Sequence, residues 1–228
     1  EAGATPDAQL FDMLRSIADD LSDETSPQTL ARCADFFIDN GQFEKACHLY
    51  VKGKRFDEAL DLCVSHKVKL TEDMAEAMTL PKSADAEESA RRQGLLDKIA
   101  RVCKKQGSYQ LACKKFTQAG DKLKAMKCLL KSGDTEKIIF FADVSRNQKI
   151  YILAANYLQT LDWHADAEVM KNIVAFYTKA KALEQLSGFY DACAQVEIDE
   201  YRDYEKALGA LREAHMYLTK ARVQGKED

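Results

Sequence analysis

NGQFEKACHLY (residues 40–50) and QGSYQLACKKF (residues 106–116) lie 66 residues apart and align without a gap. Their glycine, alanine and cysteine coincide, and aromatic residues stand opposite one another at the fourth and last positions. The same offset brings Ala59 to Ala125. An internal repeat of this length predicts a fold built by stacking similar units.

Each residue type of the repeat suits the turn between two antiparallel helices. The glycine follows a helix end and is expected to adopt a left-handed backbone, which a Cβ atom would oppose. The aromatic residue two positions later is expected to open the next helix and pack into the hairpin. The alanine three positions further on shares its face, where a small side chain lets two backbones approach. A partial third copy, YEKA, begins at Tyr204. The repeat positions are Gly41, Phe43, Ala46, Gly107, Tyr109, Ala112, Tyr204 and Ala207.

The dipeptide Asn40-Gly41 is also a signal for a hairpin between two strands. The flanking apolar residues, however, recur at steps of three and four, as Ile99, Val102 and Cys103 illustrate. The offset is close to twice the roughly 34-residue tetratricopeptide unit. The predicted fold class is therefore all-α, a right-handed α-solenoid of tetratricopeptide-like helical hairpins.

One continuous solenoid is predicted over residues 1–228. It would begin with an amphipathic helix within residues 1–25 and end in a frayed polar tail at residues 223–228. The predicted N-terminal caps are Ser26 with Pro27, Asp85 with Glu88, and Ser145 with Gln148. The predicted helices span residues 28–40, 43–52, 56–65, 71–79, 86–106, 109–119, 122–132, 135–144, 147–161, 165–180, 182–194 and 201–223.

The composition favours a soluble helical protein. Apolar residues make up 46% of the chain, and three prolines in 228 residues permit long helices. The formal charge of −4 argues against a nucleic-acid binder. No apolar run approaches the roughly eighteen residues of a transmembrane segment, and no secretory leader is expected. Because the sequence begins at Glu1, we expect it to be part of a longer chain.

The cysteines indicate a reducing compartment. Their number is odd, no two are spaced as C-x-x-C, and six stand beside small or aliphatic residues, which is typical of core positions. A disulfide framework is therefore not expected. The seven are Cys33, Cys47, Cys63, Cys103, Cys113, Cys128 and Cys193.

No motif for catalysis or cofactor binding is found. The sequence lacks G-x-S-x-G, G-x-x-x-x-G-K and H-E-x-x-H. Cys63 and His66 are one helical turn apart, but a metal site would need two further ligands, so a core cysteine beside a surface histidine is favoured. The run 162–164 (DWH) contains an acid and an imidazole without a nucleophile, and we interpret it as a helix junction anchored by Trp163. We predict no enzyme activity, catalytic residue, cofactor or metal.

Charge is unevenly distributed. Ten basic residues stand against three acidic ones from Arg101 to Lys137, whereas the first thirty residues carry seven acidic residues and one basic residue. The lysines can simply solvate outer helical faces. Alternatively, they form a surface that docks an acidic partner or anionic headgroups. The candidate interaction surface comprises Lys104, Lys105, Lys114, Lys115, Lys122, Lys124 and Lys127.

The segment VEIDEYRDY (residues 196–204) is acidic and aromatic. It could recognise a basic partner, or it could form a helix junction whose tyrosines pack inward. The second interpretation is favoured because Tyr204 belongs to the repeat.

Three longer strings are more specific than a generic repeat. They are GSYQLACKKFTQAGDKLKAMKCLLKSGDTEKI from Gly107, IYILAANYLQTLDW from Ile150 and GFYDACAQVEIDEY from Gly188. From about Gln28 to Leu218 the chain closely resembles the C-terminal tetratricopeptide region of the intraflagellar transport protein 140 family.

This resemblance implies a scaffold subunit of intraflagellar transport complex A, which is associated with retrograde ciliary traffic and import of ciliary membrane proteins. It implies other complex A subunits and ciliary membrane-protein cargo adaptors as partners. It also implies a location in the cilium or flagellum, the basal body and the cytoplasm, and it assigns no catalytic residue. The alternative is a tetratricopeptide adaptor or a vesicle-coat-like scaffold elsewhere in the cytosol.

Overall fold

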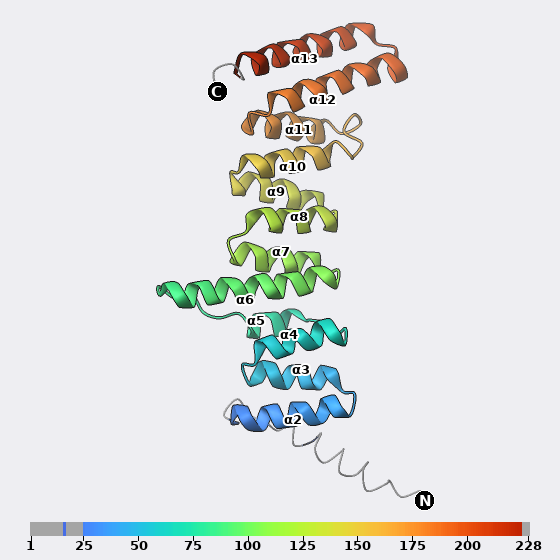
Figure 1. Cartoon of the computed structure of the whole chain (residues 1–228). Coiled ribbons are helices and arrows are strands. Elements are labelled where there is room, and N and C mark those ends of the chain that lie inside the picture. Colours follow the sequence, from blue (N-terminus) through green and yellow to red (C-terminus); the bar gives the residue numbers. More distant parts are fainter. Residues whose placement is uncertain (1–15, 17–24, 225–228) are drawn as a thin grey trace, which may run out of the picture. The chain divides into compact units, whose positions relative to one another are not determined.

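A computed structural model describes residue 16 and residues 25–224 of the chain. These residues form twelve α-helices, α2 to α13, and one π-helical turn, and they contain no strand (Figure 1). The predicted all-α fold of tetratricopeptide-like hairpins is therefore confirmed. The chain divides into two compact units, unit 1 (residues 1–120) and unit 2 (residues 121–228). That the units form one right-handed solenoid stays a prediction.

Unit 1 is a stack of helices, in which tight turns join α2 to α3, α3 to α4 and α6 to α7. Neighbours in sequence pack against each other, as α2 does with α3 and α6 with α7, and α4 also contacts α6. The core is formed by the faces that carry the small and aliphatic residues of the repeat. Its helices are α2 (Pro27–Asp39), α3 (Phe43–Lys52), α4 (Phe56–Ser65), α5 (Glu72–Ala77), α6 (Ala86–Lys105) and α7 (Tyr109–Gln118).

Unit 2 follows the same plan, and its most extensive contact is between α12 and α13. A π-helical turn, η1 (Glu197–Tyr201), separates these two helices and ends at Arg202, which has a left-handed backbone with φ +54°. The sequence predicted a helix from residue 201 and did not predict this turn. The α-helices are α8 (Lys122–Ser132), α9 (Thr135–Ser145), α10 (Gln148–Leu158), α11 (Ala167–Lys179), α12 (Leu183–Val196) and α13 (Tyr204–Gln224).

The repeat positions of unit 1 have the predicted geometry. Gly41 and Gly107 have φ values of +71° and +79°, the left-handed region that favours glycine. The aromatic residues two positions later open α3 and α7. Ala46 and Ala112 are fully buried. Small side chains therefore lie where the helices approach closely.

The third copy of the repeat departs from this pattern. Ala207 is buried, but Tyr204 is 63% exposed and Tyr201 is also exposed. The inward packing predicted for these tyrosines is wrong. Both lie beside the η1 turn, whose π-helical geometry was not visible in the repeat alignment.

Enlarging a buried alanine of the repeat is expected to destabilise unit 1. Ala46→Leu adds a branched side chain at a position with no exposed surface, and we expect the free energy of unfolding to fall by about 1–3 kcal/mol. Urea denaturation followed by circular dichroism measures this change. Glu44→Leu, at an exposed position of the same helix, is the control; an equal loss in both variants would contradict the buried seam.

Two of the three predicted helix caps are confirmed. The Ser26 hydroxyl accepts a hydrogen bond from the Thr29 N–H, and the Asp85 carboxylate accepts one from the Glu88 N–H. The cap predicted at Ser145 is wrong, because α9 continues through this residue. Asn147 caps α10 instead and accepts hydrogen bonds from two backbone N–H groups.

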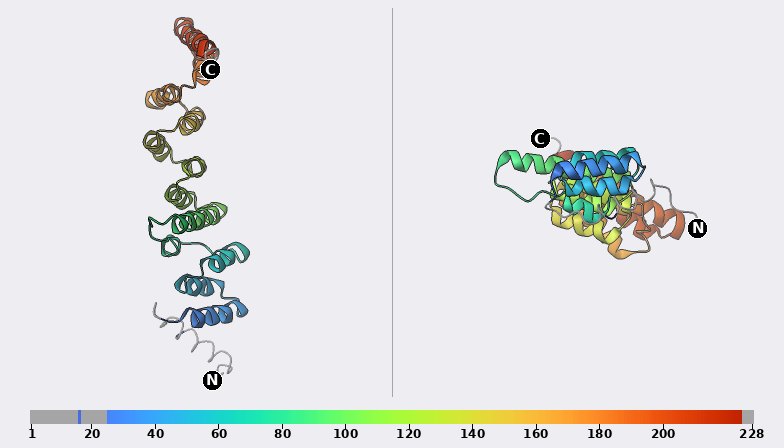
Figure 2. Two further views of the ribbon diagram at one scale, coloured as in Figure 1. Left: turned by 60° about the vertical axis from the view of Figure 1, so that its left-hand side comes forward. Right: turned by 90° about the horizontal axis from the view of Figure 1, so that it is seen from below.

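Helix α6 differs from its neighbours in length and in burial. Its buried residues, Leu96 to Cys103, all lie in its second half. The first half, residues 86–95, contains no buried side chain and extends past the other helices of unit 1 (Figure 2). The side chains of this half of α6 are therefore exposed or half-buried on all faces of the helix. The leading helix predicted within residues 1–25 lies, apart from residues 16 and 25, outside the described residues, as do residues 225–228 of the predicted tail. Val223 and Gln224, which were assigned to the tail, belong to α13.

Candidate functional site

The seven lysines of the candidate interaction surface are divided between the two units. Lys104 and Lys105 are exposed at the end of α6. Lys114 and Lys115 lie in α7 and also belong to unit 1. The other three, Lys122, Lys124 and Lys127, lie in α8 of unit 2.

Lys115 is a buried residue and is not part of a surface. Its side chain has 0% exposure. The Nζ atom donates a hydrogen bond to the Thr79 hydroxyl at 2.7 Å and lies 3.2 Å from Glu76 Oε2. Its placement on an interaction surface was therefore an error. The repeat contained the signal, because an offset of 66 residues brings Lys115 onto Leu49, which is also buried.

The charge of Lys114 is balanced within the protein. Its Nζ lies 2.7 Å from Glu76 Oε1 and 2.9 Å from Glu72 Oε1. The hydrogen bonds from Lys114 and Lys115 lower the pKa of Glu76, and those from Glu76 and Glu72 raise the pKa of Lys114. The pair Lys114 and Lys115 thus joins α7 to α5 and contributes little positive charge for a partner.

Two of the three lysines in α8 have intramolecular contacts. Lys124 Nζ forms an ion pair with Asp121 at 2.9 Å, and Lys122 Nζ donates a hydrogen bond to the Ser145 carbonyl at 3.3 Å. The side chain of Lys127 is exposed. In unit 2, two of these lysines therefore make contacts within the fold.

A cationic groove lies between the end of α4, the chain that follows it and the end of α6. It has a volume of about 410 Å³. Valines contribute an apolar surface, and Val64 is 48% exposed. We call it the lysine groove; it is lined by Val64, Lys67, Lys69, Val102, Lys105 and Gln106, together with Cys63.

Gln106 fixes the shape of the lysine groove. Its side-chain oxygen accepts a hydrogen bond from the Leu70 N–H at 2.8 Å, and its amide nitrogen donates to the Val68 carbonyl at 2.7 Å. A longer contact reaches the Cys63 carbonyl at 3.4 Å. These bonds hold the backbone of residues 68–70 to Gln106 at the end of α6, so the segment that carries Lys67 and Lys69 has a defined position. The sequence did not reveal this role, because Gln106 looked like an ordinary helix end.

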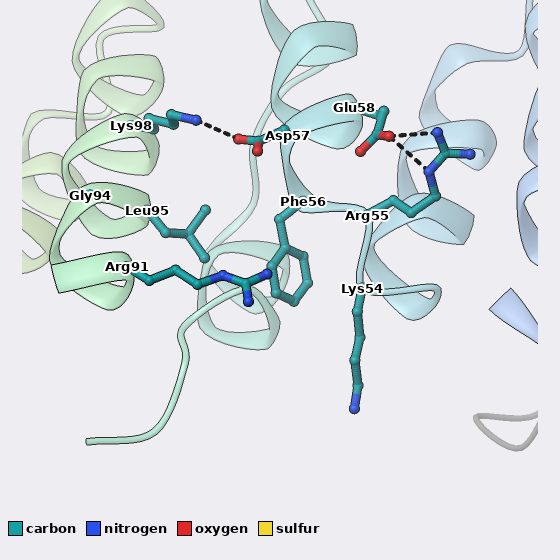
Figure 3. Close-up of a pocket in the computed structure, with 9 residues that line it drawn as sticks. All are labelled: Lys54, Arg55, Phe56, Asp57, Glu58, Arg91, Gly94, Leu95 and Lys98. Carbon is teal, nitrogen blue, oxygen red and sulfur yellow. Dashed lines mark hydrogen bonds and ion pairs between the residues drawn. The ribbon is translucent and has the colours of Figure 1, made fainter. Parts of the chain in front are cut away.

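A second groove, the α6 groove, lies between the start of α4 and the first half of α6 and has a volume of about 460 Å³. Lys98 Nζ lies 2.7 Å from Asp57 Oδ1, and the Arg55 Nε–H donates to Glu58 at 2.8 Å. Figure 3 shows both pairs, with Arg91 extending from α6 beside them. Each of the two acids that line this groove therefore forms an ion pair with one of its basic residues. The lysine groove, in contrast, is lined by three lysines and no acid.

An aromatic cluster in unit 2 involves the loop before α11, helix α12 and the η1 turn. The Trp163 ring packs on Phe189 with centroids 5.1 Å apart, as expected of a junction anchor. The His164 ring stacks on Tyr201 at 4.5 Å, and its Nε2 lies 3.2 Å from Glu197 Oε1. These contacts join the loop before α11 to the η1 turn. The imidazole of His164 and the carboxylate of Glu197 therefore contribute to the packing of this junction.

Catalytic or metal-binding chemistry finds no support in the described part of the chain. No cluster of three His, Cys, Asp or Glu side chains suited to a metal occurs among residue 16 and residues 25–224. Cys63 and His66 have different neighbours: the His66 ring stacks on Phe43 at 3.6 Å, whereas the Cys63 sulfur faces Cys47.

Within the same described residues, no helix has both the length and the apolar run needed to cross a membrane.

Comparison with known families gives two matches that together cover most of the chain. Residues 5–176 match the family described as the TPR domain of intraflagellar transport proteins 140 and 172. Residues 184–228 match the family described as the C-terminal TPR domain of intraflagellar transport protein 140. The first match spans more than half of the chain and includes both copies of the repeat around Gly41 and Gly107.

Proposed function

The chain belongs to the tetratricopeptide domain family of intraflagellar transport proteins 140 and 172, and from this premise we propose that it is a non-catalytic scaffold segment of an intraflagellar transport complex A subunit. Family membership implies association with other complex A components and with the cilium. The finer role is assembly of the complex for retrograde transport and for ciliary import of membrane proteins. The protein would be located at the basal body and in the cytoplasm as well as in the cilium. Its partners would include ciliary membrane-protein cargo adaptors.

The lysine groove is the observation that carries this proposal. Lys67, Lys69 and Lys105 line a groove that also presents Val64 and Val102. Such a groove fits an acidic segment with one or two aliphatic side chains, since opposite charges steer association and the apolar contacts hold the complex. The proposed occupant is an acidic segment of a neighbouring complex A subunit.

The geometry of the groove is available before a partner binds. Gln106 holds the backbone of Val68 and Leu70, on either side of Lys69, through two hydrogen bonds of 2.7 and 2.8 Å. Among the described residues, no ion pair of 4.0 Å or less joins Lys67, Lys69 or Lys105 to an acid of the chain. The groove therefore differs from the Lys114 site, where Glu72 and Glu76 already supply the negative charge.

Reversing the three groove lysines tests the proposal. In the full-length protein, Lys67→Glu, Lys69→Glu and Lys105→Glu together are expected to weaken binding to the complex A partner. The weakening should be about 10–100-fold, since each exposed pair is worth up to about 1 kcal/mol and about 1.4 kcal/mol is tenfold in affinity. The salt dependence of binding should fall as well. Biolayer interferometry with purified subunits measures both quantities.

The control carries the same change of charge outside the groove. Lys54, Lys82 and Arg91 are exposed and lie near the starts of α4 and α6, whereas the groove is formed at the ends of these helices. Their reversal should leave the affinity within about threefold, because charges beyond a Debye length are largely screened. Equal losses in both triple variants would refute a site at the groove. Binding of the wild-type chain to anionic vesicles instead of a subunit would reassign the groove to lipid headgroups.

The alternative function, an adaptor or coat-like scaffold elsewhere in the cytosol, makes a different prediction for the cell. A tagged full-length protein that moves along the axoneme supports the ciliary scaffold. A tagged protein that remains on cytosolic vesicles supports the alternative.

A further inference from the structure

Two cysteine side chains face each other inside the α3–α4 hairpin. The sulfur atoms of Cys47 and Cys63 are 3.6 Å apart, close to van der Waals contact. The Cys47 Sγ also lies 3.4 Å from the carbonyl oxygen of Ala59. Both residues are buried and reduced. A disulfide needs a sulfur–sulfur distance of about 2.05 Å, so the two sulfur atoms would have to approach by about 1.5 Å.

The two thiols differ in their access to solvent. Cys63 lines the lysine groove, which opens to the surface. Cys63 is 2% exposed, whereas Cys47 has no exposed surface and is not among the residues that line the groove. A small reagent that enters the groove therefore meets Cys63 first.

We propose that Cys47 and Cys63 are a reversible dithiol–disulfide site, in which hydrogen peroxide entering through the lysine groove oxidises Cys63 and Cys47 then resolves it. This inference does not depend on the proposed scaffold function. In the first step the Cys63 thiolate attacks one peroxide oxygen, the O–O bond breaks, and hydroxide leaves; the product is Cys63 sulfenic acid. In the second step the Cys47 sulfur attacks the Cys63 sulfur and loses its proton. Water leaves as the disulfide forms, so two thiols are oxidised and one peroxide is reduced to two waters.

The electrostatics of the pair support this order. A hydrogen bond from the Cys47 thiol stabilises the Cys63 thiolate and lowers the pKa of Cys63, against the opposing effect of burial. The same interaction, together with burial, raises the pKa of Cys47. The thiolate is the form that reacts with peroxide. The sulfur that is reached first is therefore also the sulfur that ionises more readily.

Peptide mapping of the intact chain tests the disulfide. After treatment with hydrogen peroxide and alkylation, trypsin should release ACHLYVK (residues 46–52) joined to FDEALDLCVSHK (residues 56–67), with two hydrogen atoms lost. Dithiothreitol should separate the two peptides. Cys47→Ser and Cys63→Ser should each abolish the joined peptide, whereas Cys33→Ser should leave its yield unchanged. Cys33 is the suitable control because it is less buried than the pair.

Trapping with dimedone, which captures sulfenic acids, tests the order. In Cys47→Ser the intermediate cannot be resolved, so Cys63 should carry the dimedone adduct at a level at least tenfold above wild type. In Cys63→Ser the adduct on Cys47 should stay at background. Oxidation of Cys33 without the joined peptide in the wild-type chain would overturn the proposal. An adduct on Cys47 in Cys63→Ser equal to that on Cys63 in Cys47→Ser would overturn the assigned roles.

Discussion

Lys115→Glu is expected to destabilise unit 1 by roughly 3–5 kcal/mol, the cost of leaving a buried charge without its counter-charge. Lys115 is fully buried, and its Nζ is held by Thr79 and Glu76. Glutamate at this position would place a second negative charge beside Glu76 and away from solvent. Urea denaturation followed by circular dichroism measures the free energy of unfolding.

Two matched variants separate the buried charge from the charge change itself. Lys114→Glu reverses the neighbouring lysine, which is exposed, and its effect should be much smaller. Lys115→Met places an apolar side chain where the other copy of the repeat has Leu49. It should change stability by about 1 kcal/mol or less, because Glu76, the partner left behind, is 41% exposed and keeps its ion pair with Lys114. If Lys114→Glu and Lys115→Glu lose equal stability, Lys115 is not buried as described.

Phe189→Ala is expected to destabilise unit 2 by about 3–5 kcal/mol, through lost burial and the cavity left behind. Phe189 is buried in α12 and contacts Trp163. Trp163 is the single tryptophan of the chain, so its fluorescence reports directly on this region during urea denaturation. The emission of the folded variant should also shift to longer wavelength, because water can approach the indole.

Phe140→Ala is the control for this substitution. Phe140 lies in α9 of the same unit and is 68% exposed, so its removal should change stability by about 0.5 kcal/mol or less. Losses of similar size in the two variants would show that the Trp163–Phe189 contact is not part of a packed core.

The repeat made most of the fold predictable from the sequence. Its glycines mark helix ends because the backbone there is left-handed, and its alanines mark the buried seam. Most helix boundaries were predicted to within two or three residues. The resemblance to the intraflagellar transport protein 140 family, drawn from three strings of residues, is confirmed by the two family matches.

The failures of prediction have local physical causes. Ser145 and Asn147 are both suitable cap residues, and asparagine prevails because its side chain accepts from two N–H groups while Arg146 takes a left-handed backbone. Tyr204 was assigned an inward position from the repeat, but the preceding π-helical turn reorients the start of α13.

The lysine groove could not be predicted because its parts are distant in the sequence. Gln106 bonds to residues up to 43 positions away, and only the folded chain brings Lys67 and Lys69 to Lys105. A run of lysines in the sequence drew attention to α7 and α8 instead. There Lys115 is buried and Lys114 is neutralised, so local charge density is a poor guide to the charge that a partner meets.

Lysine footprinting of the assembled complex tests the central claim, that this chain acts as a scaffold through the lysine groove, most directly. Acetylation of free and complex-bound full-length protein would be compared by mass spectrometry, residue by residue. We predict that Lys67, Lys69 and Lys105 react at least tenfold more slowly in the complex, while Lys82 and Lys171 react at the same rate in both states. Unchanged reactivity at all three groove lysines in the complex would contradict the account.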